Sequence, residues 1–329
     1  MRRLTGSRSA MLALTFAGAV LSSSGVAFAG DRVVLVSWDG VRRDILEELN
    51  HWGDPVQSPR DCPNGRHEPV QPQICDGHWS CVPTICAFQM LDSAVVEGKP
   101  LTRPQHAQML TGYGPEETGD ITNAGKRSVP EGMTIYERIH AARPEIRTVH
   151  IAGRKFVGAG IIRWAQRDGA LDLDMRRGGR DDYTGDNTTQ RFTEALDAVG
   201  KDPFFIFVHY KAVDVIGHRS GDKSKTYREA LVQTDEELGN VLNELAERGL
   251  LDTTEVYVTT DHGFDGIFHV SFEKVSVHDT WFASHSHNLV GEQATVLDLT
   301  PTVLETLGIS TTNANPPYRG HSLLAGPLP

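Results

Sequence analysis

The sequence has no excess of basic residues and no long apolar run in its main part, and both absences limit its function. It holds 32 Lys and Arg against 43 Asp and Glu, a net charge of −11. This acidic balance argues against a protein that binds nucleic acid or an anionic membrane surface. Beyond residue 29, no stretch is long and apolar enough to cross a bilayer. The chain also lacks internal repeats and low-complexity tracts.

Residues 1–29 have the pattern of a secretory signal peptide. Three arginines make the start positive, an apolar stretch covers 11–20, and Ala27-Phe28-Ala29 is an A-x-A cleavage site. An N-terminal membrane anchor is the alternative, but the apolar stretch is short of a full span. We predict an exported protein, periplasmic or secreted, whose mature chain begins near Gly30. Without the signal, residues 30–329 have a net charge of −14 and are enough for a single α/β domain.

The cysteines are few and fall within one stretch rich in Pro, Gly and His, residues 50–89. They are Cys62, Cys75, Cys81 and Cys86. Disulfides persist in exported proteins, so two local disulfides are the expected outcome. A four-thiolate zinc site is the alternative, although no C-x-x-C pair is present. We predict a disulfide-stapled loop insertion over residues 50–89, because this stretch has little apolar core of its own.

Apolar, β-branched runs alternate with helical patterns along the mature chain. The runs at 33–37, 148–152, 204–208 and 256–260 are apolar on both faces, as buried parallel strands are. Helical periodicity is clearest over 134–142, 188–199, 227–248 and 299–307. This alternation predicts an α/β fold, a three-layer α/β/α sandwich around a mostly parallel central sheet.

Residues of metal-ligand type directly follow three of the predicted strands. Asp39 follows the first, Asp214 and His218 follow the third, and Asp261-His262 follow the fourth. Carboxylates and imidazoles are the ligands of catalytic Zn²⁺ or Mn²⁺ sites, and the carboxyl ends of strands are where open α/β sheets collect them. Three such positions favour one site built from distant parts of the chain.

Thr102 precedes a short helical pattern with a proline at its front, where a hydroxyl and a backbone N–H can meet an anion. A threonine hydroxyl is a weak nucleophile unless a divalent metal promotes loss of its proton. Alone, Thr102 would be read as an ordinary helix cap. Together with the strand-end ligands, it indicates a metal-assisted nucleophile.

These segments, in this order and spacing, resemble the alkaline phosphatase superfamily, and most of all its branch of nucleotide pyrophosphatases and type I phosphodiesterases. The resemblance extends from residue 33 to about 308 and implies an alkaline phosphatase-like fold. It rests on residues 37–42 (SWDGVR), 102–106 (TRPQH), 110–112 (LTG), 115–116 (PE), Asn123, 208–210 (VHY), 214–218 (DVIGH) and 260–264 (TDHGF).

The resemblance implies two divalent metal ions, with Zn²⁺ favoured over Mn²⁺. One ion would be held by Asp39, Thr102, Asp261 and His262, and the other by Asp214, His218 and a third ligand. Thr102 would attack phosphorus to give a phospho-threonine, which a metal-activated water then hydrolyses. Asn123 and the backbone N–H of Thr102 would hold the non-bridging oxygens as charge develops.

Several histidines could complete the second metal site. We choose His269, because in the resembled branch this ligand lies shortly after D-H-G and about ten residues before an apolar strand, here 280–283. His278, His285 and His287 remain alternatives, and the last two are expected at the surface or rim. For His106 and His209, a structural role with ordinary hydrogen bonds is the stronger interpretation.

The chain departs from relatives at the nucleophile and just after it. Sulfatases need a cysteine in C-x-P-S-R, and this position is Thr102. Arg103 stands where nucleotide-cleaving members often carry an aromatic residue, which leaves nucleotide specificity open. We also expect the cysteine loop and Lys126–Gly132 to shape substrate access.

We therefore predict an exported two-metal phosphoesterase of phosphodiesterase type. Its substrate would be a small-molecule or headgroup phosphoester and no nucleic-acid polymer, and it would have no stable membrane span. The alternatives are a phospho-headgroup transferase, a sulfatase-like hydrolase, and a non-catalytic member whose cysteine loop binds a partner. No oligomeric state is predicted.

Overall fold

The computed structural model describes residues 30–50, 82–119, 121–124, 127–176, 187–291 and 293–325. Predictions for the signal peptide and for Cys62, Cys75 and Cys81 lie outside these residues. Cys86 is described and is not a free thiol, while the pairing of the cysteines stays a prediction. Within the described part, no helix combines the length and apolarity that crossing a membrane requires.

Eight strands of the described residues form one sheet in the order β4-β3-β5-β1-β6-β7-β2-β8. β7 runs antiparallel to its neighbours β6 and β2, and all other pairs are parallel. The strands are β1 (Arg32–Trp38), β2 (Gln89–Val95), β3 (Arg147–Ala152), β4 (Leu173–Arg176), β5 (Phe204–Tyr210), β6 (Thr254–Thr260), β7 (Asp279–Ser284) and β8 (Ala294–Thr295).

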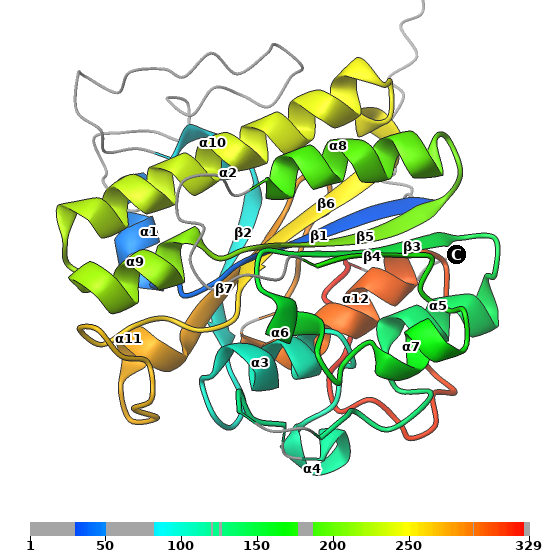
Figure 1. Ribbon diagram of the computed structural model, residues 1–329, viewed down its shortest axis with the longest axis horizontal. Helices are drawn as coiled ribbons and strands as arrows, with labels where there is room; N and C mark the ends of the chain where they lie inside the picture. Colours follow the sequence, from blue (N-terminus) through cyan, green and yellow to red (C-terminus); the bar gives the residue numbers. More distant parts are fainter. Residues whose placement is uncertain are drawn as a thin grey trace, which may run out of the picture.

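Helices cover both faces of the sheet (Figure 1). One face carries α1 (Arg43–Asn50), α2 (Pro83–Cys86), α8 (Thr188–Val199), α9 (Ala212–Ser220) and α10 (Lys225–Glu247). The other carries α3 (Thr102–Met109), α4 (Pro115–Thr118), α5 (Ile135–Ala142), α6 (Lys155–Gly158), α7 (Arg163–Arg167) and α12 (Leu299–Thr306). The short helix α11 (Val275–His278) and the 3₁₀ turns Leu251–Thr253 and Val296–Asp298 complete the elements.

The central strand β1 shows why the sheet is buried on both sides. Val34 and Val36 join the apolar cluster under α1, α8 and α10, whereas Val33 and Leu35 join the cluster under α3, α5 and α12. Successive side chains of a strand point to opposite faces, so a continuous apolar run supplies both cores. The predicted three-layer α/β/α sandwich with a mostly parallel sheet is confirmed.

The end of the predicted loop insertion is ordered differently from the prediction. Residues 83–86 form α2, and Gln89 begins β2. Asp235 of α10 explains the helical turn, because its buried carboxylate accepts hydrogen bonds from the N–H groups of Thr84 (2.9 Å) and Ile85 (2.8 Å). A carboxylate at this position satisfies donors that a helix start leaves unpaired.

Asp235 should make stability depend on pH. Burial raises its pKa to about 7, against the lowering effect of the bonds from Thr84 and Ile85. Between its ordinary pKa near 4 and about 7, the folded state keeps a proton that the unfolded state has lost, so this group's contribution to stability falls as pH rises. Asp235→Asn has no such proton to lose.

We expect the stability of wild type relative to Asp235→Asn to decline between pH 4 and pH 8, as measured by urea unfolding of both proteins. Asp202→Asn, a change at an exposed aspartate, is the control. A wild-type-minus-variant difference that stays constant with pH would contradict the assignment.

Candidate metal centre and nucleophile

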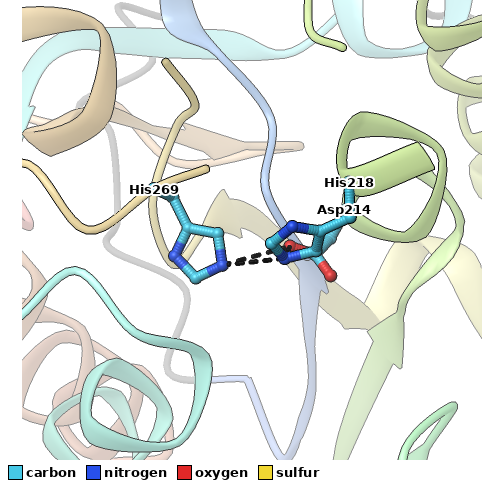
Figure 2. Close-up of side chains that lie close together, drawn as sticks. All are labelled: Asp214, His218 and His269. Carbon is cyan, nitrogen blue, oxygen red and sulfur yellow. Dashed lines mark hydrogen bonds and ion pairs between the residues drawn. The ribbon is translucent and has the colours of Figure 1, made fainter. Parts of the chain in front are cut away.

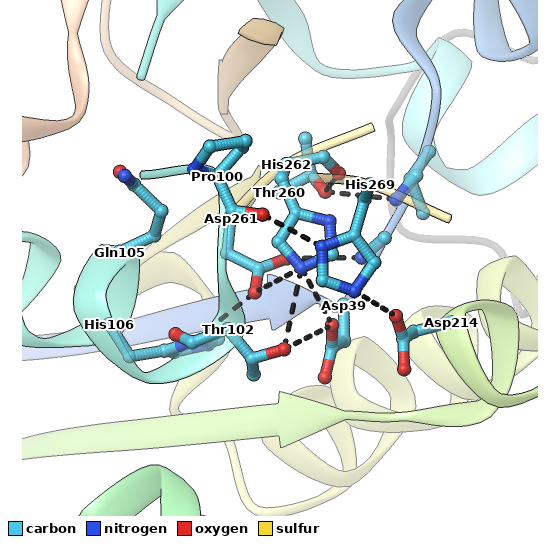
Figure 3. A network of polar contacts seen from close by, with 12 residues as sticks. Asp39, Pro100, Thr102, Gln105, His106, Asp214, Thr260, Asp261, His262 and His269 are labelled. Atoms are coloured by element: carbon cyan, nitrogen blue, oxygen red, sulfur yellow. Dashed lines mark hydrogen bonds and ion pairs between the residues drawn. The ribbon is translucent and has the colours of Figure 1, made fainter. Parts of the chain in front are cut away.

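The site lies where neighbouring strands end side by side. Trp38, the last residue of β1, pairs with Tyr210 and with Thr260, the last residues of β5 and β6. Asp39 therefore emerges beside Asp261, and α9 begins two residues after β5. Figure 3 shows the resulting side chains converging on one point from these separate elements.

A first group of donor atoms surrounds Nε2 of His262. Asp261 Oδ2 lies 3.3 Å from this nitrogen, Thr102 Oγ1 3.4 Å and Asp39 Oδ1 3.6 Å. All four side chains are buried. The other ring nitrogen, Nδ1, lies 3.1 Å from the carbonyl of Gly263, which places the ring proton there and leaves the Nε2 lone pair for a ligand.

A second group is formed by Asp214, His218 and His269 (Figure 2). Asp214 and His218 are four residues apart in α9 and so share one face of the helix. The Nε2 atoms of His218 and His269 lie 3.1 Å apart and 3.4 Å and 3.6 Å from Asp214 Oδ1. Both rings use Nδ1 for a backbone carbonyl, so their Nε2 lone pairs face the same space.

These residues fit divalent metal ions. Asp214 Oδ1 and Asp261 Oδ2 are buried without any hydrogen-bond partner in the described part of the chain, and such oxygens are costly unless a cation compensates them. Ligand atoms of Asp39, Asp214 and His262 also lie within 4.8 Å of one another. Asp214 thus lies between the two groups, and the mixture of carboxylates and imidazoles is chemistry that suits zinc or manganese.

The pKa values of these groups reflect their burial. Burial raises the pKa of Asp39 to about 6 and that of Asp261 well above its usual range, with the neighbouring carboxylates adding to both shifts. Burial acts the same way on Asp214, but the neighbouring His218 imidazole and the charge of Arg154 outweigh it and lower the pKa. Burial also lowers the pKa of His262 well below its ordinary value, which keeps it neutral as a ligand must be.

Arg154 was absent from the sequence prediction. It follows β3, which ends beside β5 at the same edge of the sheet. Its guanidinium pairs with Asp214 and lies 3.4 Å from Asp39 Oδ2, with only 18% of the side chain exposed. Its position soon after the predicted strand 148–152 could have indicated that it belongs to the site. An arginine after a strand, however, matches no metal-ligand pattern. It supplies positive charge between two of the carboxylates.

Two buried histidines lie beneath the donor groups. His209 Nε2 is 3.0 Å from Asp39 Oδ2. His106 contacts the carbonyl of Thr102 through Nδ1 (2.6 Å) and the hydroxyl of Ser37 through Nε2 (2.9 Å). The prediction of hydrogen-bonded structural residues describes these contacts well, and through them both histidines position Asp39 and Thr102.

Thr102 is the first residue of α3, and Asn123 lies against the same helix end. The side-chain oxygen of Asn123 accepts the backbone N–H of Arg103 at 2.9 Å, so its NH₂ group is the end left to donate. Asn123 is therefore held against the start of α3 by the backbone N–H of Arg103.

The Arg103 side chain is buried and binds backbone carbonyls of the chain itself. It donates to the carbonyls of Ala159 (2.6 Å), Thr122 (2.9 Å) and Arg127 (2.6 Å). Arg103 therefore fixes the segment that carries Asn123.

The alternative histidines lie elsewhere. His287 is bound to Glu255 at 2.6 Å near the amino end of β6, opposite the site, and His285 is beside it. His278 pairs with Asp279 at 2.8 Å. Of the four candidates from the sequence, His269 is the one that the structure places against His218.

Residues 148–315, which include Asp214, His218, Asp261, His262 and His269, match the family described as type I phosphodiesterase / nucleotide pyrophosphatase. The chain belongs to this family. The resemblance predicted from the sequence motifs is thereby confirmed, and the chain carries two groups of residues that could hold a metal ion.

Solved structures show the same fold at low sequence identity. The structure of BT1596, a 2-O GAG sulfatase, is 14% identical with a TM-score of 0.62, covering 89% of this chain and 73% of its own. A protein of the alkaline phosphatase superfamily from Vibrio parahaemolyticus is 13% identical (TM-score 0.60; 89% and 69%). The lipoteichoic acid synthase LtaP from Listeria monocytogenes is 15% identical (TM-score 0.55; 87% and 74%). No curated protein matches the chain.

The contacts of Asp214, His218 and His269 predict how loss of the His269 imidazole affects zinc binding. His269→Ala should weaken zinc binding at one of two sites by at least about 100-fold, since loss of a direct ligand exceeds the roughly 10–100-fold effect of an outer partner. Competition with a zinc-binding dye measures this. His278→Ala, a change at a histidine paired with Asp279, is the control, and equal losses in the two variants would contradict the assignment.

Arg154 predicts a difference between metal-free and metal-loaded protein. Arg154→Gln leaves Asp39 and Asp214 without their cation, so chelator-treated protein should lose about 3–5 kcal/mol of unfolding free energy. With zinc bound, the loss should shrink because the ions supply the positive charge. Arg248→Gln, which breaks a pair with the exposed Asp197, should cost about 1 kcal/mol or less in both states. An equal loss for Arg154→Gln with and without zinc would refute this.

Proposed function

We propose that the protein is an exported two-metal phosphoesterase that uses Thr102 as its nucleophile. The observation that supports this best is the position of the Thr102 hydroxyl, which lies 3.4 Å from His262 Nε2 and 3.5 Å from Asp39 Oδ1 at the start of α3. A hydroxyl inside a metal-type donor set, at a helix start that favours anions, suits attack on phosphorus. Membership of the phosphodiesterase family favours a diester as the substrate.

Asp39, Thr102, Asp261 and His262 would hold one ion, and Asp214, His218 and His269 the other, with zinc favoured by the histidines. When bound, the two ions would promote loss of the Thr102 proton and take up charge on the phosphoryl oxygens. Their ligand residues arrive from β1, α3, α9 and the segment after β6, so the fold brings both groups together before substrate binds.

The reaction proceeds in two displacements. Thr102 Oγ1 forms a bond to phosphorus while the bond to the leaving-group oxygen breaks, which gives a phospho-threonine. Water then attacks from the opposite side, breaks the Oγ1–P bond and restores the hydroxyl proton of Thr102. The NH₂ group of Asn123 donates to a non-bridging oxygen, and the planar donors of Arg154 match a phosphoryl group in the same space.

At saturating zinc, Thr102→Ala should reduce hydrolysis by on the order of 10⁴-fold while the fold persists, because the other three residues that would hold the first ion remain. Turnover of 4-nitrophenyl phosphate, bis(4-nitrophenyl) phosphate and 4-nitrophenyl sulfate by the zinc-loaded protein measures this. Thr102→Ser keeps a hydroxyl and should retain most activity, and Thr312→Ala, at an exposed position, is the control. Activity that survives Thr102→Ala would remove Thr102 from the mechanism.

The substrate panel also separates the alternatives. A phospho-headgroup transferase, which the likeness in fold to the lipoteichoic acid synthase LtaP suggests, would give the acceptor ester as product when an alcohol is added. Faster cleavage of the sulfate ester would indicate the activity named for the sulfatase neighbour. Zinc-loaded protein without turnover of any ester would favour a non-catalytic member.

A further inference from the structure

Arg103 is a buried, charged side chain that the proposed reaction does not use. It directly follows Thr102 in α3, and only 2% of its surface is exposed. Burial lowers its pKa, but a guanidinium stays charged in proteins. A charge held away from water is costly unless its donors are satisfied. The groups that this guanidinium binds therefore indicate its role.

The guanidinium joins two separate segments of the chain to the start of α3. It donates to the carbonyls of Thr122 (2.9 Å) and Arg127 (2.6 Å) in the segment after α4, and to that of Ala159 (2.6 Å) after α6. The segments also meet directly, since the N–H of Val129 donates to the carbonyl of Gly160 at 2.9 Å. A planar guanidinium suits such a contact, because its donors form a rigid fork.

Asn123 is held by Arg103 at two points. The backbone N–H of Arg103 donates to Oδ1 of Asn123 at 2.9 Å, and the guanidinium holds the carbonyl of the preceding residue, Thr122. A backbone N–H can only donate, so the carbonyl oxygen of the Asn123 amide must face it and the NH₂ group faces elsewhere. Asn123 is exposed. The two bonds therefore fix both the place of Asn123 and the direction in which its NH₂ group donates.

The segment of Asn123 has little else to fix it. Residues 121–124 and 127–134, between α4 and α5, form neither helix nor strand. The contact with Ala159, by contrast, ties the guanidinium to an ordered part of the fold, because α6 comes soon after β3 within the central sheet. Arg103 thus links the Asn123 segment to the framework that carries the nucleophile.

We propose that Arg103 is a positioning residue, which holds the NH₂ group of Asn123 in place to bind a phosphoryl oxygen beside the Thr102 hydroxyl. The proposal rests on the proposed phosphoesterase function. Arg103 acts through Asn123 and does not touch the substrate, because its side chain is buried and binds carbonyls of the chain. A displacement of about 1 Å in such a donor is enough to cost on the order of 100-fold in rate.

A double-mutant cycle with inorganic phosphate as the probe tests this. Calorimetry on the zinc-loaded full chain should show phosphate binding about tenfold weaker in Asn123→Ala, because a hydrogen bond to a charged group is lost. Arg103→Lys keeps the charge without the planar fork and should weaken binding by a similar factor. The double variant should bind within about twofold of Asn123→Ala alone, since both changes remove the same contact.

Turnover of bis(4-nitrophenyl) phosphate gives a second readout. In Arg103→Lys, kcat should fall by a larger factor than KM rises, because the Asn123 bond strengthens as charge develops on the phosphoryl oxygen. Arg143→Lys is the matched control. The Arg143 guanidinium also holds a backbone carbonyl, that of Leu307 at 2.9 Å, and it pairs with Asp31 at the other end of β1. This variant should keep the kcat and phosphate affinity of wild type.

A purely structural arginine would give a different result. Arg103→Lys would then lower the amount of folded protein, and with it the calorimetric stoichiometry, while the folded fraction kept the phosphate affinity of wild type. That outcome would overturn the proposal. Equal losses from Arg103→Lys with and without the Asn123 side chain would also overturn it, as would wild-type protein that binds no phosphate.

If Arg103→Lys does not fold, hydrogen exchange in the zinc-loaded wild type decides. Phosphate should slow exchange of the Arg103 N–H, because the bound ion holds Asn123 against it, and exchange that phosphate leaves unchanged would refute the assignment. Wild-type protein that binds phosphate but turns over no ester would overturn the phosphoesterase function. The phosphate affinities of the variants would still decide the role of Arg103.

Discussion

Three buried carboxylates converge in one pocket, and the remainder of the site depends on how their charge is balanced. Asp39, Asp214 and Asp261 are fully buried. Asp39 and Asp261 directly follow β1 and β6, and Asp214 lies in α9, which begins just after β5. Like charges in a water-poor space repel strongly, which is why burial and neighbouring carboxylates raise the pKa of Asp39 and Asp261. Arg154 offsets part of this charge, and His262 stays neutral because burial lowers its pKa. Burying these three carboxylates together costs free energy without cations and is favourable with them. Their convergence therefore identifies a functional centre better than any single sequence motif does.

Tight backbone packing brings the carboxylates to this distance. Gly40 has φ of 74°, and a Cβ there would lie 2.6 Å from the Phe264 ring and 2.8 Å from Cβ of Asp214. A Cβ on Gly217 would lie 2.8 Å from the same ring. Gly40 of the D-G motif and Gly217 of the D-x-x-G-H motif therefore let three segments approach one another: the loop after β1, helix α9 and the segment after β6. The Tyr227 hydroxyl adds a further tie, since it donates to the Gly40 carbonyl at 2.6 Å and accepts the Arg42 N–H at 2.9 Å.

The central strands and long helices could be predicted because their signals are local. The apolar runs at 33–37 and 204–208 became β1 and β5, and the helix predicted over 188–199 is α8. Strand β2 and helix α2 could not be predicted, because β2 is defined by pairing with β7 and α2 by the distant Asp235. At the site, the aspartates and histidines that come soon after predicted strands could be assigned to one site from the sequence. Arg154 gave no such signal, since its role arises only where it meets Asp39 and Asp214, each more than fifty residues away in the chain.

The two donor groups differ in their access to water, and this difference has a kinetic consequence. The first group is sealed, since Asp39, Asp261 and His262 have no exposed surface. The second includes His218, with 42% of its side chain exposed on the rim of α9. A two-ion centre built in this way would not gain or lose its ions together: the outer position exchanges with solvent, while the inner one is retained until the fold opens. Partially loaded protein would then be a uniform species with the ion beside Thr102 in place, and the supply of metal would set activity through the outer position alone.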